Sequence, residues 1–433
     1  MSYLTPNSES RRVIQGTFVR RKLWMAARRS PHGSIEKLTV GRRVDKTSKG
    51  IKTESSSPNE AEFQDKEQEE VPRPVFRLGP VITDWDEQRA QWLKENPGKN
   101  LNRKGKPKMI LVTSSQPDPC PISKGELYLV KALKNKMDYT RLHDIELYYN
   151  MAIMDPAMTG FFIKHPMVRK LMLSHPEAEW IWWMDSDAFF TDMSFELPME
   201  KYKDHNLVLQ GWADAIYRDK NWIGLNAGIF LIRNCQWSLT MLDKWVAMGE
   251  DYDDHRQKMG TLTAQVLAGR PDFVIDDQSA LVYLLVTTES DELRSKVYLE
   301  NSYSLHGYWV WAMGRHDELM KEMPPRKEGE EYWPFITHFV GCKSCTGAYT
   351  SYDIDLCFAE MERAFNIADN QVLHIFGFEH EDLTSQEIKR TRRDWGSPLD
   401  HLDRVGELDF LQKHPWRPTV EPNIFQSNAE SVK

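Results

Sequence analysis

Two aspartates separated by one residue directly follow a strongly apolar segment. The segment is Trp180–Met184, and Asp185-Ser186-Asp187 comes immediately after it. Carboxylates at the end of a buried strand are costly unless they are paired or bind a cation. At the carboxyl end of a parallel strand, such acids face the ligand crevice of an α/β sheet. Because Mg²⁺ and Mn²⁺ prefer carboxylate and phosphate oxygens, the pattern favours a site for a metal and a diphosphate.

A cation bound there would offset the charge that develops on a departing diphosphate, which is the main catalytic need in transfer from a nucleotide sugar. One alternative is an acidic turn that only caps the next segment, since short Asp-x-Asp matches arise often by chance. A phosphatase with an aspartyl nucleophile is another alternative. It usually has Thr or Val two places after the second acid, where Phe189 stands here. The position after an apolar strand favours the metal site.

A second polar cluster, Asp276-Asp277-Gln278, lies between a short apolar run and a helical one. Asp276 has an alternative role as the N-cap of that helix. Two acids and an amide provide more polar groups than a cap requires. Asp277 and Gln278 are therefore expected to bind acceptor hydroxyls or to stabilise positive charge on a sugar ring.

A third cluster combines a histidine with a lysine. His338 lies inside a predicted strand, and Lys343 follows the glycine turn at Gly341. Neutral imidazole on a metal and an ammonium group on a diphosphate would suit these residues, with an ordinary core histidine as the equal alternative. Cys342 and Cys345 have redox or zinc spacing without a second such pair. A local disulfide or plain packing is favoured over structural zinc held with His338 and Cys357.

Alternating strands and helices would position these clusters. Met109–Val112, a helix over Leu127–Met137 and Ile145–Tyr149 form a β-α-β unit, the opening of a parallel sheet. Trp222–Gly228 has the small residues found where backbone approaches a ligand, or a tight turn. Further strands are predicted at Leu207–Leu209, Ile229–Ile232, Val297–Leu299 and Phe335–Phe339, and further helices at Trp85–Trp92, Met167–Ser174, Ser238–Met248, Gln278–Val286 and Ile354–Phe376.

The 433 residues carry a formal net charge of -8 and have a sequence pI near 6.0, which disfavours a nucleic-acid partner. Five cysteines leave at least one thiol without an intramolecular partner. No window approaches the length of an apolar spanning helix, so the chain as given is expected to be soluble. Four regions are predicted: a disordered tail or stem at 1–75, a linker with a short helix at 76–107, an α/β domain at 108–395 and an irregular tail at 396–433.

The motifs resemble those of the plant xyloglucan 6-xylosyltransferases, a family that also contains galactomannan galactosyltransferases. The similarity extends from about Lys108 to Asp394. It is carried by Trp180–Asp192, Gly224–Ser238, Asp276-Asp277-Gln278, Leu305-His306-Gly307 and Thr337–Lys343.

This resemblance implies an α/β fold of the GT-A type, a Rossmann-like nucleotide-sugar-binding fold with a mixed central sheet and flanking helices. It also implies a UDP-sugar donor, Mn²⁺, and retaining transfer to O6 of a β-1,4-linked backbone. By position, the metal ligands would be Asp185, Asp187 and His338, and Lys343 would touch the diphosphate. Thr113, Ser114, Ser115, Asp138 and Ser186 would bind the nucleotide, and Asn226, Asp276, Asp277, Gln278 and His306 would surround the sugar.

The segment His338–Cys345 and Trp333-Pro334-Phe335 look more like the xylosyl branch, so UDP-xylose and a β-1,4-glucan acceptor are favoured over galactosyl transfer to a mannan. A catalytically silent glucan-binding partner in a synthase complex remains an alternative, as does hydrolysis by paired carboxylates. Members of the family are Golgi type II membrane proteins that make cell-wall hemicellulose. Oligomerisation with related transferases is therefore expected, although this sequence has no visible membrane anchor.

Overall fold

The structure is a computed structural model, and it describes residues 79–413 with gaps at 154, 156–157, 159, 251–253, 289–290, 323–332, 348–350 and 392–403. The predicted tail at 1–75 and most of the predicted tail at 396–433 lie outside the described residues. Among the helices that are described, none has the length and apolar character to cross a bilayer.

A six-stranded mixed sheet forms the centre of the domain, in the order β2-β1-β3-β6-β5-β7. β2, β1 and β3 are parallel, β6 runs antiparallel to both β3 and β5, and β7 is parallel to β5. This topology confirms the predicted α/β fold of the GT-A type with a mixed sheet. The strands are β1 (Met109–Ser114), β2 (Glu146–Asn150), β3 (Trp180–Met184), β5 (Leu207–Gly211), β6 (Leu225–Arg233) and β7 (Val297–Glu300).

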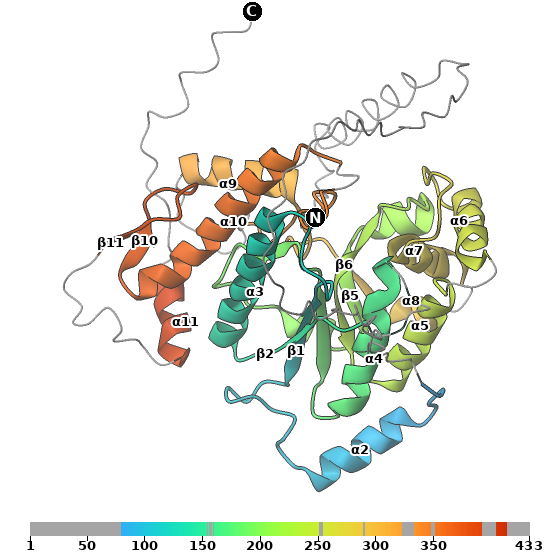
Figure 1. Cartoon of the computed structure of the whole chain (residues 1–433). Coiled ribbons are helices and arrows are strands. Elements are labelled where there is room, and N and C mark those ends of the chain that lie inside the picture. Colours follow the sequence, from blue (N-terminus) through green and yellow to red (C-terminus); the bar gives the residue numbers. More distant parts are fainter. Residues whose placement is uncertain are drawn as a thin grey trace, which may run out of the picture. The chain divides into compact units, whose positions relative to one another are not determined.

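Side chains alternate between two buried faces of this sheet, as the period of a strand requires. In β3, for example, Trp183 packs into one hydrophobic cluster and Trp182 into the other. Helices cover both faces, so the central strands are apolar along their whole length. Figure 1 shows α4 (Lys164–Ser174), α5 (Gln236–Ala247) and α7 (Asp277–Thr287) on one side, and α3 (Ser123–His143), α10 (Ile354–Ile375) and α11 (Arg404–Lys413) on the other.

A second, three-stranded sheet brings distant parts of the chain to the end of β3. β4 (Ala188–Phe190) begins directly after Asp187 and pairs antiparallel with β9 (Ile336–His338), which also pairs with β8 (Gly307–Tyr308). The register places Ala188 opposite His338. A histidine 151 residues away in the sequence is thereby fixed beside the aspartates.

The predicted helices and strands are all present, with bounds that differ by a few residues. The hairpin of β10 (Phe378–His380) and β11 (Ile388–Arg390) was not predicted, nor were β4, β8, α6 (His255–Val266), α8 (Asp291–Ser295) and α9 (Trp309–Glu322). α11 corrects the expectation of irregular structure after residue 396, because its Leu408, Phe410 and Leu411 are buried. The remaining elements are α2 (Trp85–Glu95), η1 (Gly160–Ile163), η2 (Met199–Tyr202) and η3 (Asp214–Arg218).

Candidate active site

The two aspartates and the histidine converge on one point. One ligand atom each from Asp185, Asp187 and His338 lies within 4.8 Å of the others. His338 Nε2 is 3.0 Å from Asp187 Oδ1 and 3.8 Å from Asp185 Oδ2, while the carboxylates are only about 30% exposed. Two carboxylate oxygens and an imidazole nitrogen form a donor set that suits a divalent cation such as Mn²⁺. The residues present therefore fit the implied metal.

Gly228 on β6 lies directly against this cluster. A Cβ built on it would fall 2.4 Å from the His338 Cε1 atom and 2.6 Å from Asp185 Oδ2. The backbone of β6 also holds the first aspartate, since Asp185 N–H donates to the Gly228 carbonyl oxygen at 2.9 Å. Only a residue without a side chain allows this approach, and the predicted approach of the Trp222–Gly228 backbone to a ligand stays a prediction.

A buried lysine that sequence reasoning did not identify joins the aspartates to the second cluster. Lys164, at the start of α4, lies 2.7 Å from Asp277 Oδ2 and 3.6 Å from Asp185 Oδ1. It also donates to the Ala227 carbonyl oxygen at 2.8 Å. Burial, together with the charges of Asp276 and Asp185, raises the pKa of Asp277 to about 6 against the opposing effect of Lys164. The lysine charge therefore favours the ionised form of Asp277.

The three residues of the second cluster have different roles in the structure. Asp276 is the N-cap of α7, where its carboxylate accepts from Ser279 N–H at 2.7 Å and pairs with Arg270 at 3.4 Å. These contacts are those of the capping alternative, so a catalytic contribution from Asp276 stays a prediction. Asp277 pairs with Lys164 of α4, whereas Gln278 contacts β6. Gln278 Oε1 accepts from Asn226 Nδ2 at 3.3 Å.

His306 lies behind the metal-ligand cluster. Its ring stands edge-on to that of His338, with 4.8 Å between centroids, and its buried Nε2 has no hydrogen-bond partner among the described residues. Burial lowers the pKa of His306 well below its ordinary value. Ser186, between the two aspartates, is half-buried. The structure therefore brings His306 and Ser186 to the same place as the three predicted metal ligands.

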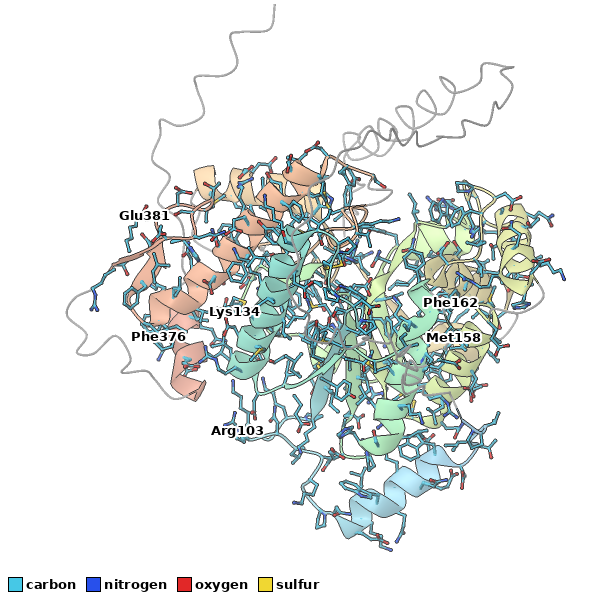
Figure 2. The ribbon with its side chains drawn as sticks, in the orientation of Figure 1. Arg103, Lys134, Met158, Phe162, Phe376 and Glu381 are labelled. Atoms are coloured by element: carbon cyan, nitrogen blue, oxygen red, sulfur yellow. A yellow bond between two sulfur atoms is a disulfide. The ribbon has the colours of Figure 1, made fainter. Side chains whose placement is uncertain are left out.

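The predicted nucleotide tip, Thr113–Ser115, consists of the last two residues of β1 and the residue after them, at the carboxyl end of the parallel strands. Thr113 is buried, its Oγ1 without a partner among the described residues, and Ser115 Oγ lies 2.6 Å from the Tyr149 hydroxyl. Ser114 ends the strand. Asp138, on α3, pairs with Lys134 at 2.6 Å, and Lys134 also pairs with Asp369 of α10, so a contact of Asp138 with the nucleotide stays a prediction. Lys134, which Figure 2 labels on α3, thus joins Asp138 to the contact between α3 and α10.

Lys343 is exposed in the loop 341–347, and both flanking cysteines are in disulfides. Cys342 pairs with Cys357 at the start of α10, and Cys345 pairs with Cys120 in the segment between β1 and α3. The zinc alternative is thereby excluded for these cysteines. The sequence favoured a local disulfide or plain packing, and the structure has two disulfides, neither of which joins Cys342 to Cys345. Cys235 is the free thiol that the odd count required.

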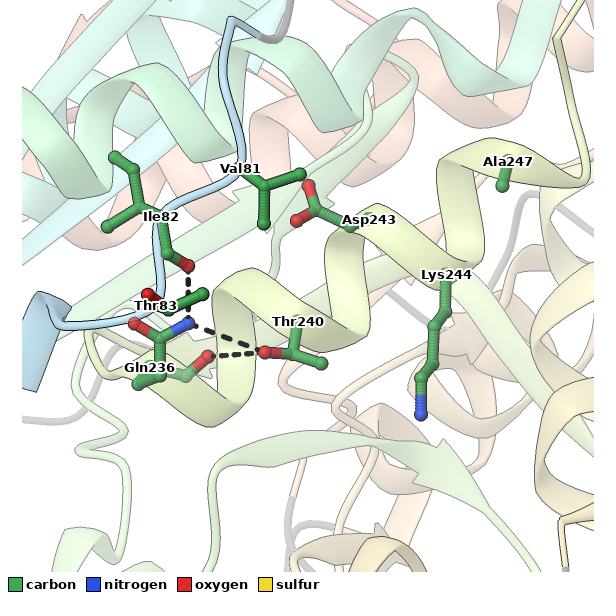
Figure 3. A pocket seen from close by; sticks show the side chains of 8 residues that line it. All are labelled: Val81, Ile82, Thr83, Gln236, Thr240, Asp243, Lys244 and Ala247. Atoms are coloured by element: carbon green, nitrogen blue, oxygen red, sulfur yellow. Dashed lines mark hydrogen bonds between the residues drawn. The ribbon is translucent and has the colours of Figure 1, made fainter.

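A surface hollow of about 580 Å³ lies at the opposite end of the sheet, and Figure 3 shows the side chains that line it. It lies between Val81–Thr83 and α5, where Gln236 Nε2 donates to the Ile82 carbonyl oxygen at 2.8 Å. β3 pairs Trp180 with Arg233, so Gln236 lies at the end of the sheet away from Asp185. The hollow is lined mainly by apolar surface and has none of the predicted chemistry.

Comparison with known proteins gives a consistent family. The model of the galactosyl transferase GMA12/MNN10 family matches residues 105–348. Xyloglucan 6-xylosyltransferase 2 of Arabidopsis thaliana is 50% identical over 349 residues, which cover 80% of this chain and 75% of the relative. Xyloglucan 6-xylosyltransferase 1 of Arabidopsis thaliana is 51% identical over 334 residues, covering 77% of this chain and 72% of the relative.

Similar solved structures are more distant. One is a glycosyltransferase involved in the glycosylation of the major capsid of PBCV-1, with a TM-score of 0.37 and 12% identity, covering 59% of this chain and 99% of that one. Another is a galactosyltransferase in complex with donor and acceptor sugar analogues, with a TM-score of 0.31 and 13% identity, covering 60% and 95%. Likenesses this distant carry no weight for function.

Proposed function

Because this chain is a glycosyltransferase that belongs to the galactosyl transferase GMA12/MNN10 family, we propose that it moves α-xylose from UDP-xylose to O6 of glucose in a β-1,4-glucan backbone. The convergence of Asp185, Asp187 and His338 carries the proposal, because transfer from a nucleotide sugar needs a group that stabilises the leaving diphosphate. Two relatives at about 50% identity that are named xyloglucan 6-xylosyltransferases support the xylosyl donor and the glucan acceptor.

Mn²⁺ would be held by those three side chains, and it would supply positive charge to the diphosphate oxygens. Burial would raise the pKa of Asp187, but the neighbouring His338 lowers it below its ordinary value, so the carboxylate stays ionised as a ligand must. His338 presents Nε2 to both aspartates. Gly228 leaves the space that these side chains need to converge.

The other side chains bind and orient the reacting sugar. Asp277, whose ionised form is favoured by the charge of Lys164, would stabilise positive charge on the ring as the bond to UDP lengthens. Gln278 and Asn226, hydrogen-bonded to each other, would bind sugar hydroxyls. The acceptor O6 would attack the anomeric carbon from the face that UDP leaves and pass its proton to the departing diphosphate, so that the α configuration is retained. Lys343 would bind the diphosphate.

The compartment is part of the same proposal. Two disulfides, Cys120–Cys345 and Cys342–Cys357, are of the kind that persists in an oxidising lumen. They support residence in the Golgi lumen, where the protein would encounter the proposed glucan acceptor and partner transferases.

The proposal is tested with the purified protein, cello-oligosaccharides, Mn²⁺ and a panel of UDP-sugars, with products identified by mass. We expect addition of a pentose from UDP-xylose and a fall of roughly a hundredfold or more in Asp187→Ala, since a catalytic metal contributes several kcal/mol. Asp382→Ala, at an exposed turn, is the matched control and should transfer at the normal rate. Addition of a hexose from UDP-galactose to manno-oligosaccharides would assign the galactosyl alternative instead. Full activity of Asp187→Ala would refute the metal site.

A further inference from the structure

The loop 341–347 is attached at two points that flank a single lysine. Cys342 bonds to Cys357 on α10, and Cys345 bonds to Cys120, which is 225 residues away in the sequence. Lys343 lies between them. The Cys120–Cys345 disulfide thus links this loop to the segment that follows the Thr113–Ser115 tip.

Three residues of the loop have left-handed backbone conformations. Gly341 and Gly347 have φ angles of 87° and 61°, and Lys343 has a φ of 46°. A left-handed conformation is unfavourable for a residue with a side chain and persists only when the surroundings determine it. In this loop, the two disulfides supply that constraint on either side of the lysine.

The same loop rests directly on the start of α3. A Cβ on Gly125 would fall 2.3 Å from the Ser344 carbonyl oxygen, so only glycine allows this approach. Ile122 N–H donates to the Cys345 carbonyl oxygen at 3.4 Å. Gln116, the residue after the tip, donates from Nε2 to Cys345 Sγ at 2.9 Å. Contacts on both sides of the disulfide therefore fix the distance between the loop and the tip.

We propose that the Cys120–Cys345 disulfide is a positioning device that holds Lys343 at a set distance from the Thr113–Ser115 tip, so that the phosphate and nucleoside parts of one nucleotide are bound together. The inference rests on the proposed function, because it requires Lys343 to bind the diphosphate. Without the cross-link, the loop would have to be ordered when the nucleotide binds. The free-energy cost of that ordering would weaken the binding of the nucleotide.

A double-mutant cycle tests this role. The dissociation constant of UDP is measured by calorimetry in the presence of Mn²⁺ for the full chain, Lys343→Ala, Cys120→Ser/Cys345→Ser, and the triple variant. We expect the cysteine variant to bind UDP about tenfold more weakly, and the triple variant to bind no more weakly than Lys343→Ala. Such non-additivity arises only if the disulfide acts through the lysine. Cys235→Ser, which removes the free thiol, should bind UDP normally.

Several outcomes would overturn the inference. Unchanged UDP affinity in the cysteine variant would do so, as would losses that simply add, because additive losses indicate a general effect on stability. If the serine variant does not fold, Cys120→Ala/Cys345→Val keeps apolar packing and completes the cycle. Lys343→Ala binding UDP normally would refute the diphosphate role of Lys343 and the positioning role with it. Absence of UDP binding by the unchanged chain would refute the proposed function itself.

Discussion

At the residue scale, the lack of room for a side chain at Gly228 leads to a specific prediction. A methyl group there would fall inside van der Waals contact with His338 and Asp185, the two side chains that converge from different strands. Both would have to move by several tenths of an ångström or more. We therefore expect Gly228→Ala to weaken Mn²⁺-dependent UDP binding by roughly 10- to 100-fold, the range seen when the orientation of metal ligands is disturbed. Calorimetric titration of UDP with and without Mn²⁺ measures the loss.

Gly314→Ala on α9 is the matched control. A Cβ at Gly314 meets no atom within 4 Å, and the residue is helical, so the substitution should be neutral or stabilise by about 0.5–1 kcal/mol. Normal metal and UDP binding by Gly228→Ala would contradict the arrangement of the site described here.

Some residues of the site could be predicted from the sequence, and others could not. Asp185 and Asp187 were predictable because a local pattern, a buried strand followed by acids, already indicates their exposure to a ligand. Lys164 was not, because its neighbours His165, Pro166 and Met167 carry no motif and only the fold brings it to Asp277. Asp138 was assigned from the resemblance alone, and its carboxylate pairs with Lys134 one turn earlier on α3.

At the element scale, the attachment of α10 to α3 depends on a buried carboxylate. Asp369 accepts from His380 Nε2 at 2.9 Å and pairs with Lys134 of α3. Burial acts to raise its pKa, but His380 and Lys134 together lower the pKa of Asp369 below its ordinary value. We expect Asp369→Asn, which keeps the shape and loses the charge, to lower the free energy of unfolding by roughly 1–2 kcal/mol near pH 7.

The sign of the pH dependence follows from the lowered pKa. A carboxylate with a lower pKa in the folded state contributes stability above its unfolded pKa, about 4, and loses it as the pH falls through the folded value. The difference between Asp369→Asn and the unchanged protein should therefore shrink below pH 4, as followed by denaturant unfolding. Asp409→Asn, at an exposed position of α11, should change stability by less than about 0.5 kcal/mol at any pH. A pH-independent difference would argue that lost packing, not charge, is responsible.

Helices and strands were predictable where an apolar pattern, either periodic or continuous, runs through the whole element. The 22-residue helix α10 has a helical apolar period, and the strand β3 is a continuous apolar run. Both were predicted to within a few residues of their bounds. β4, β8 and β9 have two or three residues each, too short for a period, and exist because Ala188–Phe190 finds a partner far along the chain. The prediction of a strand around His338 rested on the apolar residues Phe335, Ile336 and Phe339 that surround Thr337 and His338.

At the scale of the whole molecule, α2 extends the domain beyond the predicted boundary at residue 108. Trp85 is only 5% exposed, and its Nε1 donates to Asn234 Oδ1 at 2.8 Å. Arg89 pairs with Glu179 at 2.9 Å. These contacts lie at the edge of the sheet away from the metal ligands, because Glu179 and Asn234 flank the paired residues Trp180 and Arg233. The helix in the predicted linker 76–107 therefore packs as part of the domain, and we propose a boundary before α2.

Removal of α2 should accordingly reduce stability while leaving the chemistry in place. A chain of residues 108–433 loses the buried Trp85, whose deletion from a core typically costs about 3–5 kcal/mol, relative to a chain of residues 79–433. We expect a clearly lower midpoint of thermal unfolding for the shorter chain, but an unchanged dissociation constant for UDP with Mn²⁺ below that midpoint. In the full chain, Trp85→Ala should reproduce the loss and Val81→Ala, which is 76% exposed, should not. Equal midpoints for the two chains would restore the boundary at 108, and weaker UDP binding by the shorter chain would mean that the two edges of the sheet are coupled.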